Sequence, residues 1–382
     1  MSTTGIWKLL VAIAVVALLG AACSDSDDDD GAGGDDATTT TGTPEGGTAP
    51  ETTGTTETEV TLVQSDGTLA AVQEAGVVRC GTRDALPGFA VLTPEGDHVG
   101  FDADFCRVIA AAVLGDATAV EFVDLETEQR FTALQSGEID VLVRNTTWTA
   151  GRDGAEGATF LQPNFYDGQG MMVAADAPYQ AVADMDGTTI CVAAGTTTEG
   201  NIANEFARLG IQGEVLSFDS PDLIQVAFQE GRCDGWSSDT SQLTSLRSAY
   251  PDGPEALRIL PDVFSKEPLA PAVRDGDTEW AQAVNWAILA TIQAEEFGID
   301  STNVDTFAES EDPNILTFLG INPEGGAFDP GLGLPVDFAV QVVSQVGNYG
   351  EIFEEHLTPL GLERGVNSLW TDGGLLYAPP YR

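Results

Sequence analysis

One segment of this 382-residue chain occurs twice in similar form. Residues 133–140 read Ala-Leu-Gln-Ser-Gly-Glu-Ile-Asp and residues 227–234 read Ala-Phe-Gln-Glu-Gly-Arg-Cys-Asp, so Ala, Gln, Gly and Asp match at identical spacing. Each copy follows a pattern typical of a helix and precedes a short apolar run typical of a buried strand. The repeat therefore predicts two similar lobes.

The sequence around each copy has a β-α-β-α-β order. In the first half, strands are expected at 76–81, 119–125 and 139–143, with helices at 101–114 and 127–136. In the second half, strands are expected at 188–194, 214–218 and 233–236, with helices at 199–209 and 221–230. Parallel strands linked by helices form doubly wound α/β units, in which ligands bind beyond the carboxyl ends of the strands. We expect an α/β fold with its site in the loops after the first and third strands of each lobe.

Those four loops carry side chains that suit a zwitterion. The loops span residues 82–89, 144–152, 195–199 and 237–239. They offer guanidinium groups, several hydroxyls at the start of a helix, and the carboxylate of Asp239. Arginine and the N–H groups of a helix N-terminus bind an α-carboxylate, and a carboxylate binds an α-ammonium. The residues available to line a side-chain pocket are Leu86, Phe89, Trp148 and Trp236.

The N-terminus predicts export. Residues 1–23 contain the single cation Lys8, an apolar run over 9–19, and small residues before Cys23, as in a secretory signal. The end of this segment resembles the lipobox of a bacterial lipoprotein, which makes Cys23 the predicted lipidation site. Gly20 stands where a lipobox usually carries Leu, and an ordinary signal peptide with an incidental cysteine is the alternative.

Composition limits the partners. Residues 24–60 are acidic and Thr-rich without any basic or aromatic residue, which predicts a disordered, extended tether. The whole chain has 61 Asp and Glu against 15 Lys and Arg, a net charge of −46. This excludes a nucleic-acid partner, because such binding depends on neutralising phosphates with cations. It also argues against docking on anionic lipid, so we expect membrane contact only through the lipid anchor.

Several longer segments occur in a co-linear order that is specific as a set. They are residues 77–81, 100–106, 130–142, 144–149, 166–170, 195–199, 266–269, 345–351 and 374–380. With them, residues 69–382 resemble extracellular solute-binding proteins of the polar amino-acid family, and in particular the general L-amino-acid-binding proteins of ABC importers. The resemblance implies a two-lobed periplasmic-binding-protein-like fold joined by two crossover strands. Lobe one is expected at 61–172, lobe two at 173–267, and the return to lobe one with a C-terminal extension at 268–382.

The resemblance also implies roles for individual residues. The carboxylate-binding Arg of the family falls on Arg152, and the ammonium-binding Asp falls on Asp239. The polar positions before the Arg and the helix-start hydroxyls of lobe two fall on Asn145, Thr147, Thr196, Thr197 and Thr198. Arg83 is a departure, because many of these binders carry an acidic residue there. It puts cationic ligands in doubt and favours neutral or acidic side chains.

Each of these residues also has a purely structural interpretation. Arg152 could form a surface ion pair, and Asp239 could cap the helix expected at 240–248. Thr196 and Glu199 fit a capping box, and both tryptophans named above could belong to the core. Arg144, which could pair with an internal carboxylate, is left outside the first set of site residues.

Four cysteines remain after Cys23. Exported proteins form disulfides, and four cysteines allow three pairings. Cys191 and Cys233 belong to neighbouring strands of a doubly wound sheet, while Cys106 lies on the helix that packs over the strand of Cys80. We therefore predict the pairs Cys80–Cys106 and Cys191–Cys233. No CxxC motif or Cys/His cluster is present, so no metal is expected.

A binding role is favoured over catalysis. The same fold occurs in exported dehydratases and sensor modules, so the fold alone does not decide. An enzyme needs a positioned acid or base, and both histidines, His98 and His356, fall outside the four loops. A sensor would need a following transmembrane helix and a signalling domain. We expect a monomeric, lipid-anchored receptor on the extracytoplasmic face that passes L-amino acids to an ABC permease, without cofactor or catalysis.

Overall fold

The computed structural model of the protein describes residues 67–382. The predicted signal peptide, the tether and the lipidation site Cys23 lie outside these residues. Within residues 67–382, no helix is long and apolar enough to cross a membrane.

Lobe one is built on a five-stranded sheet in the order β5-β1-β6-β15-β7. Its strands are β1 (Val78–Thr82), β5 (Val120–Asp124), β6 (Val141–Leu142), β7 (Ala158–Phe160) and β15 (Ala272–Arg274). The first strand pairs in parallel with the second and third, as predicted, whereas β15 pairs antiparallel with both β6 and β7. Strands β15 and β7 come from chain segments near the crossings between the lobes, which the β-α-β-α-β pattern does not cover.

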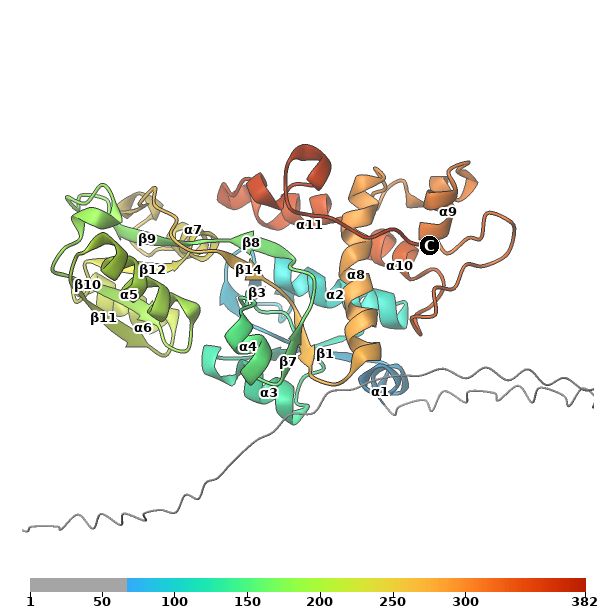
Figure 1. Cartoon of the computed structure of the whole chain (residues 1–382), viewed down its shortest axis with the longest axis horizontal. Helices are drawn as coiled ribbons and strands as arrows, with labels where there is room; N and C mark the ends of the chain where they lie inside the picture. Colours follow the sequence, from blue (N-terminus) through green and yellow to red (C-terminus); the bar gives the residue numbers. More distant parts are fainter. Residues whose placement is uncertain (1–66) are drawn as a thin grey trace, which may run out of the picture. The chain divides into compact units, whose positions relative to one another are not determined.

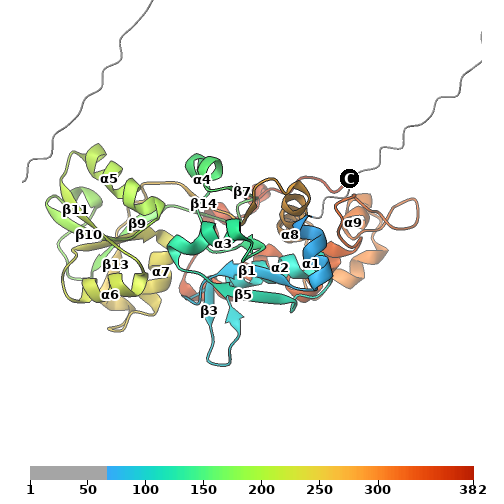
Figure 2. The same cartoon turned by 90° about the horizontal axis from the view of Figure 1, so that it is seen from below.

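Helices cover this sheet, and a small second sheet extends from it. The helices are α1 (Thr68–Ala75), α2 (Phe101–Leu114), α3 (Arg130–Ser136), α4 (Ala150–Ala155) and α8 (Thr278–Glu296), with the 3-10 turn η1 (Thr127–Gln129). The three-stranded antiparallel sheet of β2 (Ala85–Leu86), β3 (Ala90–Leu92) and β4 (His98–Val99) projects away from β1 and β5 (Figure 2). Nearly every apolar side chain of α2 is buried, because this helix contacts β1 on one side and α8 on another.

Lobe two repeats the same plan, with the order β11-β10-β12-β9-β13. Its strands are β9 (Gln169–Ala174), β10 (Thr188–Ala193), β11 (Gly213–Phe218), β12 (Gly235–Asp239) and β13 (Leu257–Ile259). Its helices are α5 (Thr197–Leu209), α6 (Pro221–Gln229) and α7 (Thr240–Ser248). The 3-10 turns η2 (Val182–Asp184) and η3 (Pro254–Ala256) also belong to this lobe. The first strand β10 lies between the second and third strands, β11 and β12, in parallel. The two lobes therefore have the same central order of three strands, as the repeat predicts.

The two connections between the lobes form a short antiparallel ribbon. Strand β8 (Phe165–Asp167) pairs with β14 (Glu267–Leu269), and each continues into the sheet of the next lobe, as Figure 1 shows. The sheet of lobe two already includes Gln169, four residues before the boundary expected at residue 173.

The C-terminal extension, residues 298–382, packs against lobe one. It contains the helices α9 (Pro313–Phe318), α10 (Phe338–Gln345) and α11 (Tyr349–His356), followed by the 3-10 turns η5 (Thr358–Leu360), η6 (Gly365–Asn367) and η7 (Trp370–Asp372), with η4 (Val304–Glu309) before α9. Helix α10 lies against α2 and α8. The extension thus enlarges the core of lobe one.

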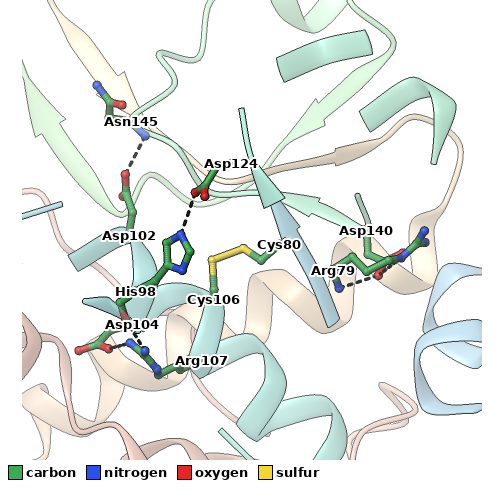
Figure 3. The surroundings of a disulfide bond; sticks show 10 residues. All are labelled: Arg79, Cys80, His98, Asp102, Asp104, Cys106, Arg107, Asp124, Asp140 and Asn145. Carbon is green, nitrogen blue, oxygen red and sulfur yellow. Dashed lines mark hydrogen bonds and ion pairs between the residues drawn. A yellow bond between two sulfur atoms is a disulfide. The ribbon is translucent and has the colours of Figure 1, made fainter. Parts of the chain in front are cut away.

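Both predicted disulfides are present, one in each lobe. Cys80 of β1 is bonded to Cys106 of α2 (Figure 3), and Cys191 of β10 is bonded to Cys233, which precedes β12. The Cα atoms of the pairs are 6.0 Å and 5.7 Å apart. In each lobe the disulfide fixes the first strand, whose carboxyl end leads to the loops expected to form the site.

Candidate functional site

The loops at the carboxyl ends of the strands line one polar pocket. Lobe one and lobe two both contribute to it, and the four loops selected from the sequence all take part. The lining residues are Arg83, Thr127, Arg130, Arg144, Asn145, Thr147 and Arg152 from lobe one, with Ala193, Thr196, Thr197, Thr198, Pro221, Ser238, Asp239 and Gln242 from lobe two. Seven of the ten residues predicted for ligand binding are among them.

The N-terminus of α5 is open towards this pocket. Thr196 is the N-cap residue, yet its hydroxyl does not cap the helix; it donates to the carbonyl of Ala193 at 2.6 Å and lies 2.5 Å from the hydroxyl of Thr198. Glu199 accepts the N–H of Gly195 at 3.0 Å, so the capping box with Thr196 does not form. The first N–H groups of α5 keep their positive potential for a bound anion.

Arg152 reaches the same pocket from the short helix α4. Thr149 caps this helix by accepting the backbone N–H of Arg152 at 3.2 Å. The guanidinium donates to the carbonyl of Thr147 at 2.9 Å and to that of Gly195, across the pocket, at 3.4 Å. No carboxylate of residues 67–382 lies within 4 Å of it, so the surface ion pair considered from the sequence is absent. Burial lowers the pKa of Arg152.

Asp239 supplies the carboxylate at the end of β12. It occupies the N-cap position of α7, but its side chain makes no capping hydrogen bond. The residue is only 6% exposed, and its Oδ1 atom has no hydrogen-bond partner. Burial, together with the nearby carboxylates of Asp167 and Glu267, raises the pKa of Asp239 well above its usual range. A buried carboxylate without a partner in a pocket is suited to a cationic group of a ligand.

Three further arginines line the pocket and were not among the predicted ligand-binding residues. Burial lowers the pKa of Arg83, of Arg144 and of Arg130, in the last case to about 9. Arg130 donates to the carbonyls of Thr127 and Gly195, and Arg144 donates to the carbonyl of Leu125. The pairing of Arg144 with an internal carboxylate is not observed. Arg83 was noted from the sequence only as a departure and Arg130 only within a family segment, because spacing does not reveal which arginines are buried.

Asn145 connects the two lobes at this pocket. It is the only non-glycine residue of the described chain with a positive φ, 30°. Asp102, at the start of α2, holds this conformation by accepting the Asn145 N–H at 3.0 Å (Figure 3). The side-chain amide of Asn145 then donates to Gln242 of lobe two at 3.1 Å.

The apolar residues predicted for the pocket lie elsewhere. Leu86 and Phe89 are fully buried in the core of lobe one, where Phe89 packs edge-on against Phe165. Trp148 is 40% exposed, stacks on Phe160 and lines a separate, more open cavity. The short strand β2 turns the residues after β1 back towards the core, which a loop drawn from the sequence does not anticipate. Trp236 belongs to the core of lobe two, the structural alternative considered above.

The histidines lie outside the pocket lining. His98 contacts Asp124 at 2.7 Å (Figure 3), and His356 contacts Asp104 at 2.6 Å. Ligand atoms of Asp104, Glu355 and His356 lie within 4.8 Å of one another, a spacing that could hold a metal ion. Arg107 also donates to Asp104 at 2.7 Å, however, and this adjacent cation opposes metal binding. We assign no metal to this cluster.

A pocket between two repeated α/β lobes, with buried charges left unpaired, defines a receptor for a small charged solute. The family of bacterial extracellular solute-binding proteins, family 3, matches residues 78–298, and the chain belongs to this family.

Individual relatives cover most of the chain. It is 46% identical to the general L-amino acid-binding periplasmic protein AapJ of Rhizobium johnstonii, over 82% of this chain and 93% of that protein. It is 43% identical to the glutamate/glutamine/aspartate/asparagine-binding protein BztA of Rhodobacter capsulatus, over 83% and 94%. Among solved structures, an ABC transporter periplasmic binding protein from Brucella ovis with glutathione bound matches with a TM-score of 0.79 and 41% identity, over 83% of this chain and all of that one.

Proposed function

We propose that this protein captures L-amino acids outside the cytoplasm and delivers them to the permease of an ABC importer. The observation that carries the proposal is the unpaired Asp239 carboxylate, buried in one pocket with an unpaired Arg152 and an uncapped helix N-terminus. An amino acid supplies the two complementary charges, because its α-carbon carries both an ammonium and a carboxylate group. The names of the similar amino-acid-binding proteins support the same ligand class.

In this proposal the two lobes bind different parts of the ligand backbone. Arg152 and the N–H groups at the start of α5 bind the α-carboxylate, and the hydroxyls of Thr197 and Thr198 are within the same lining. Asp239 binds the α-ammonium. Because the groups come from both lobes, a bound ligand stabilises the arrangement in which the lobes meet, and bending at the β8–β14 ribbon would open it.

The location and the assembly are also part of the proposal. Lipidation at Cys23 would anchor the protein on the outer face of the membrane, and residues 24–60 would hold the lobes away from the bilayer. The protein would act as a monomer that binds and releases its ligand unchanged. Relatives named as solute-binding proteins support binding rather than catalysis.

A thermal-shift screen against the twenty amino acids tests the ligand class. The purified protein is first unfolded and refolded with its disulfides intact, so that no ligand from the host remains bound. A ligand that binds only the folded state raises the melting temperature by mass action. A shift with one or more L-amino acids supports the proposal, whereas no shift with any of them contradicts it.

A further inference from the structure

We propose that Arg83, Arg130 and Arg144 form a second anion subsite, which makes the receptor selective for amino acids with an acidic side chain. This inference rests on the function proposed above and concerns the same pocket. The chemical class is a short α-amino dicarboxylate, of which glutamate and aspartate are the examples.

The charge of the lining carries the argument. The lining residues include four guanidinium groups and one carboxylate, that of Asp239; Asp167 and Glu267 lie near Asp239 outside the lining, and none of the four guanidinium groups has a carboxylate of the described residues within 4 Å. A buried cation without a partner is costly, because it loses its hydration shell without compensation. A zwitterion with a neutral side chain brings no net charge and leaves the excess in place. A ligand with a second carboxylate neutralises part of it.

The arginines are distributed along the pocket rather than gathered at one end. Arg152 donates to the carbonyl of Thr147, and Thr147 and Asp239 pair with Leu269 and Gln169, close to the hinge ribbon. Arg144 donates to the Thr127 hydroxyl, and Arg83 donates to the side chain of Asn145, the residue that follows Arg144. Arg130 donates to the carbonyl of Gly195, as Arg152 does, and shares Thr127 as a partner with Arg144, which places it between Arg152 and Arg144. The α-carboxylate and the α-ammonium therefore occupy the Arg152 end, and the side chain extends towards Arg83 and Arg144.

Arg83 is the residue of this subsite with the most free donors. It is 7% exposed, its Nε atom has no partner, and its single hydrogen bond is a long one of 3.4 Å to Asn145. Asp102 accepts the backbone N–H of Asn145 and forms no ion pair with Arg83. A planar guanidinium with unused N–H groups is matched to a carboxylate, to which it can donate two parallel hydrogen bonds.

Affinities for glutamate, glutamine and lysine measured by calorimetry on the refolded full chain test the subsite. Glutamate should bind about 10- to 100-fold more tightly than glutamine, which has the same length without the charge. Lysine should bind least, since its ammonium would face three cations. Glutamine binding as tightly as glutamate would overturn the subsite and leave the proposed function standing. Failure of every amino acid to bind would instead contradict the proposed function.

The variant Arg83→Met separates the subsite from the amino-acid backbone site. It should reduce glutamate affinity at least tenfold while changing glutamine affinity less than threefold, so the preference disappears. Arg208→Met is the matched control, because Arg208 is an exposed arginine of α5, paired with Glu205. It removes the same charge from the chain and should leave both affinities unchanged. Equal losses for glutamate and glutamine in Arg83→Met would refute the assignment.

A different observation supports a second inference, which concerns the hinge. We infer that Asn367 of the C-terminal extension is a positioning residue that fixes the hinge strand β8 and thereby slows ligand release. Its side-chain Oδ1 atom accepts the Tyr166 N–H at 2.7 Å, and its Nδ2 atom donates to the Tyr166 carbonyl at 2.9 Å. Asn367 is 3% exposed, so these bonds are shielded from water.

The geometry of the ribbon explains why such a residue is needed. Tyr166 lies opposite Pro268 of β14, and a proline has no N–H to donate. The backbone groups of Tyr166 point to the other edge of the ribbon, where Asn367 satisfies both, as a third strand would. Arg364 holds Asn367 in turn, by donating to its carbonyl at 2.8 Å. The nearby turn η5 lies against α7 of lobe two, so the extension contacts the hinge and both lobes.

The dissociation rate of the tightest-binding amino acid, measured by stopped-flow tryptophan fluorescence, tests this inference. Asn367→Ala should raise that rate about three- to tenfold, and Asn367→Asp, which keeps only the acceptor, should give a smaller rise. Asn322→Ala is the control, because Asn322 belongs to the extension and bonds only within its own turn. A lower melting temperature with an unchanged dissociation rate in both Asn367 variants would show a merely structural role and overturn the inference.

Discussion

The two faces of the pocket are built from the same repeated pattern but carry opposite chemistry. Lobe one presents four guanidinium groups from the segments that follow β1, β5 and β6, whereas lobe two presents hydroxyls, an uncapped helix start and one carboxylate. The strand order beneath both faces is the same, with the first strand between the second and third. The fold thus fixes where a site lies, and the loop residues alone decide what each face binds.

The cationic face is notable in a chain of net charge −46. The pocket lining from lobe one contains no acidic residue, although the carboxylate of Asp102 accepts the backbone N–H of the lining residue Asn145. An excess of buried positive charge next to an unpaired carboxylate is unfavourable for the empty protein. We therefore expect bound ligand to raise stability strongly, with lobe one dominating the affinity for carboxylates.

The largest effect is expected from the lobe-one face. Arg152→Ala should weaken amino-acid binding by about 3–5 kcal/mol, because the ligand α-carboxylate would be buried without its charged partner. Calorimetry with the tightest-binding amino acid measures the change, and Arg208→Ala, an exposed arginine outside the pocket, is the control. A loss below about 1 kcal/mol would remove Arg152 from the site and with it the assignment of the α-carboxylate to lobe one.

The disulfides allow the two lobes to be compared as scaffolds. Cys191 and Cys233 are separated by 42 residues, and Cys80 and Cys106 by 26. In the chain-entropy account, removing the lobe-two bond costs about 4 kcal/mol of unfolding free energy and removing the lobe-one bond about 3.5 kcal/mol. Urea unfolding of the two double Cys→Ala variants measures both. A much larger loss in either lobe would show that its disulfide also holds the native packing.

The lobe-two face should respond to pH. Asp239→Asn should cost about 2–3 kcal/mol of binding at pH 8, since the ammonium loses its charged partner. The raised pKa of Asp239 means that protons compete with the ammonium as the pH falls, so wild-type affinity should weaken towards acid pH. Binding by the variant should not depend on the titration of this carboxylate. The difference in binding free energy between wild type and variant should therefore be smaller at pH 5 than at pH 8. Binding isotherms at both pH values check this, and a difference independent of pH would contradict the role of Asp239.

The sequence predicts a pocket residue where the repeat pattern fixes its position, and does not where tertiary packing fixes it. Strand-end polar residues such as Thr196 and Asp239 could be placed because the repeat locates the strand ends in both lobes. Leu86 and Phe89 could not, because the turn into β2 depends on packing against the core of lobe one. The arginines beyond Arg152 were missed for a related reason. Burial decides whether an arginine belongs to a site or to the surface, and it follows from three-dimensional packing rather than from spacing.

The smallest effect concerns Asp102. Its titration shows whether the arginines of the lobe-one face are unpaired or already neutralised within the protein. Burial raises the pKa of Asp102 to about 7, far above its value in an unfolded chain. The folded protein then binds more protons than the unfolded chain between about pH 4 and pH 7, so this residue lowers stability as the pH rises through that range. Asp102→Asn keeps an acceptor for the Asn145 N–H and removes the charge. We expect its unfolding free energy, relative to wild type, to rise by at least about 1 kcal/mol between pH 5 and pH 8.

Denaturant unfolding of the ligand-free proteins at both pH values measures this difference, in which titrations common to the two proteins cancel. The result bears directly on the contrast between the lobes. If Asp102 were instead a partner of Arg83 and Arg144, its charge would stabilise the fold, and the variant would lose stability as the pH rises. The lobe-one face would then already be neutralised within the protein, and a ligand carboxylate would gain little there. If the unfolding free energy of Asp102→Asn relative to wild type instead increases as the pH rises, these arginines are free to bind the ligand.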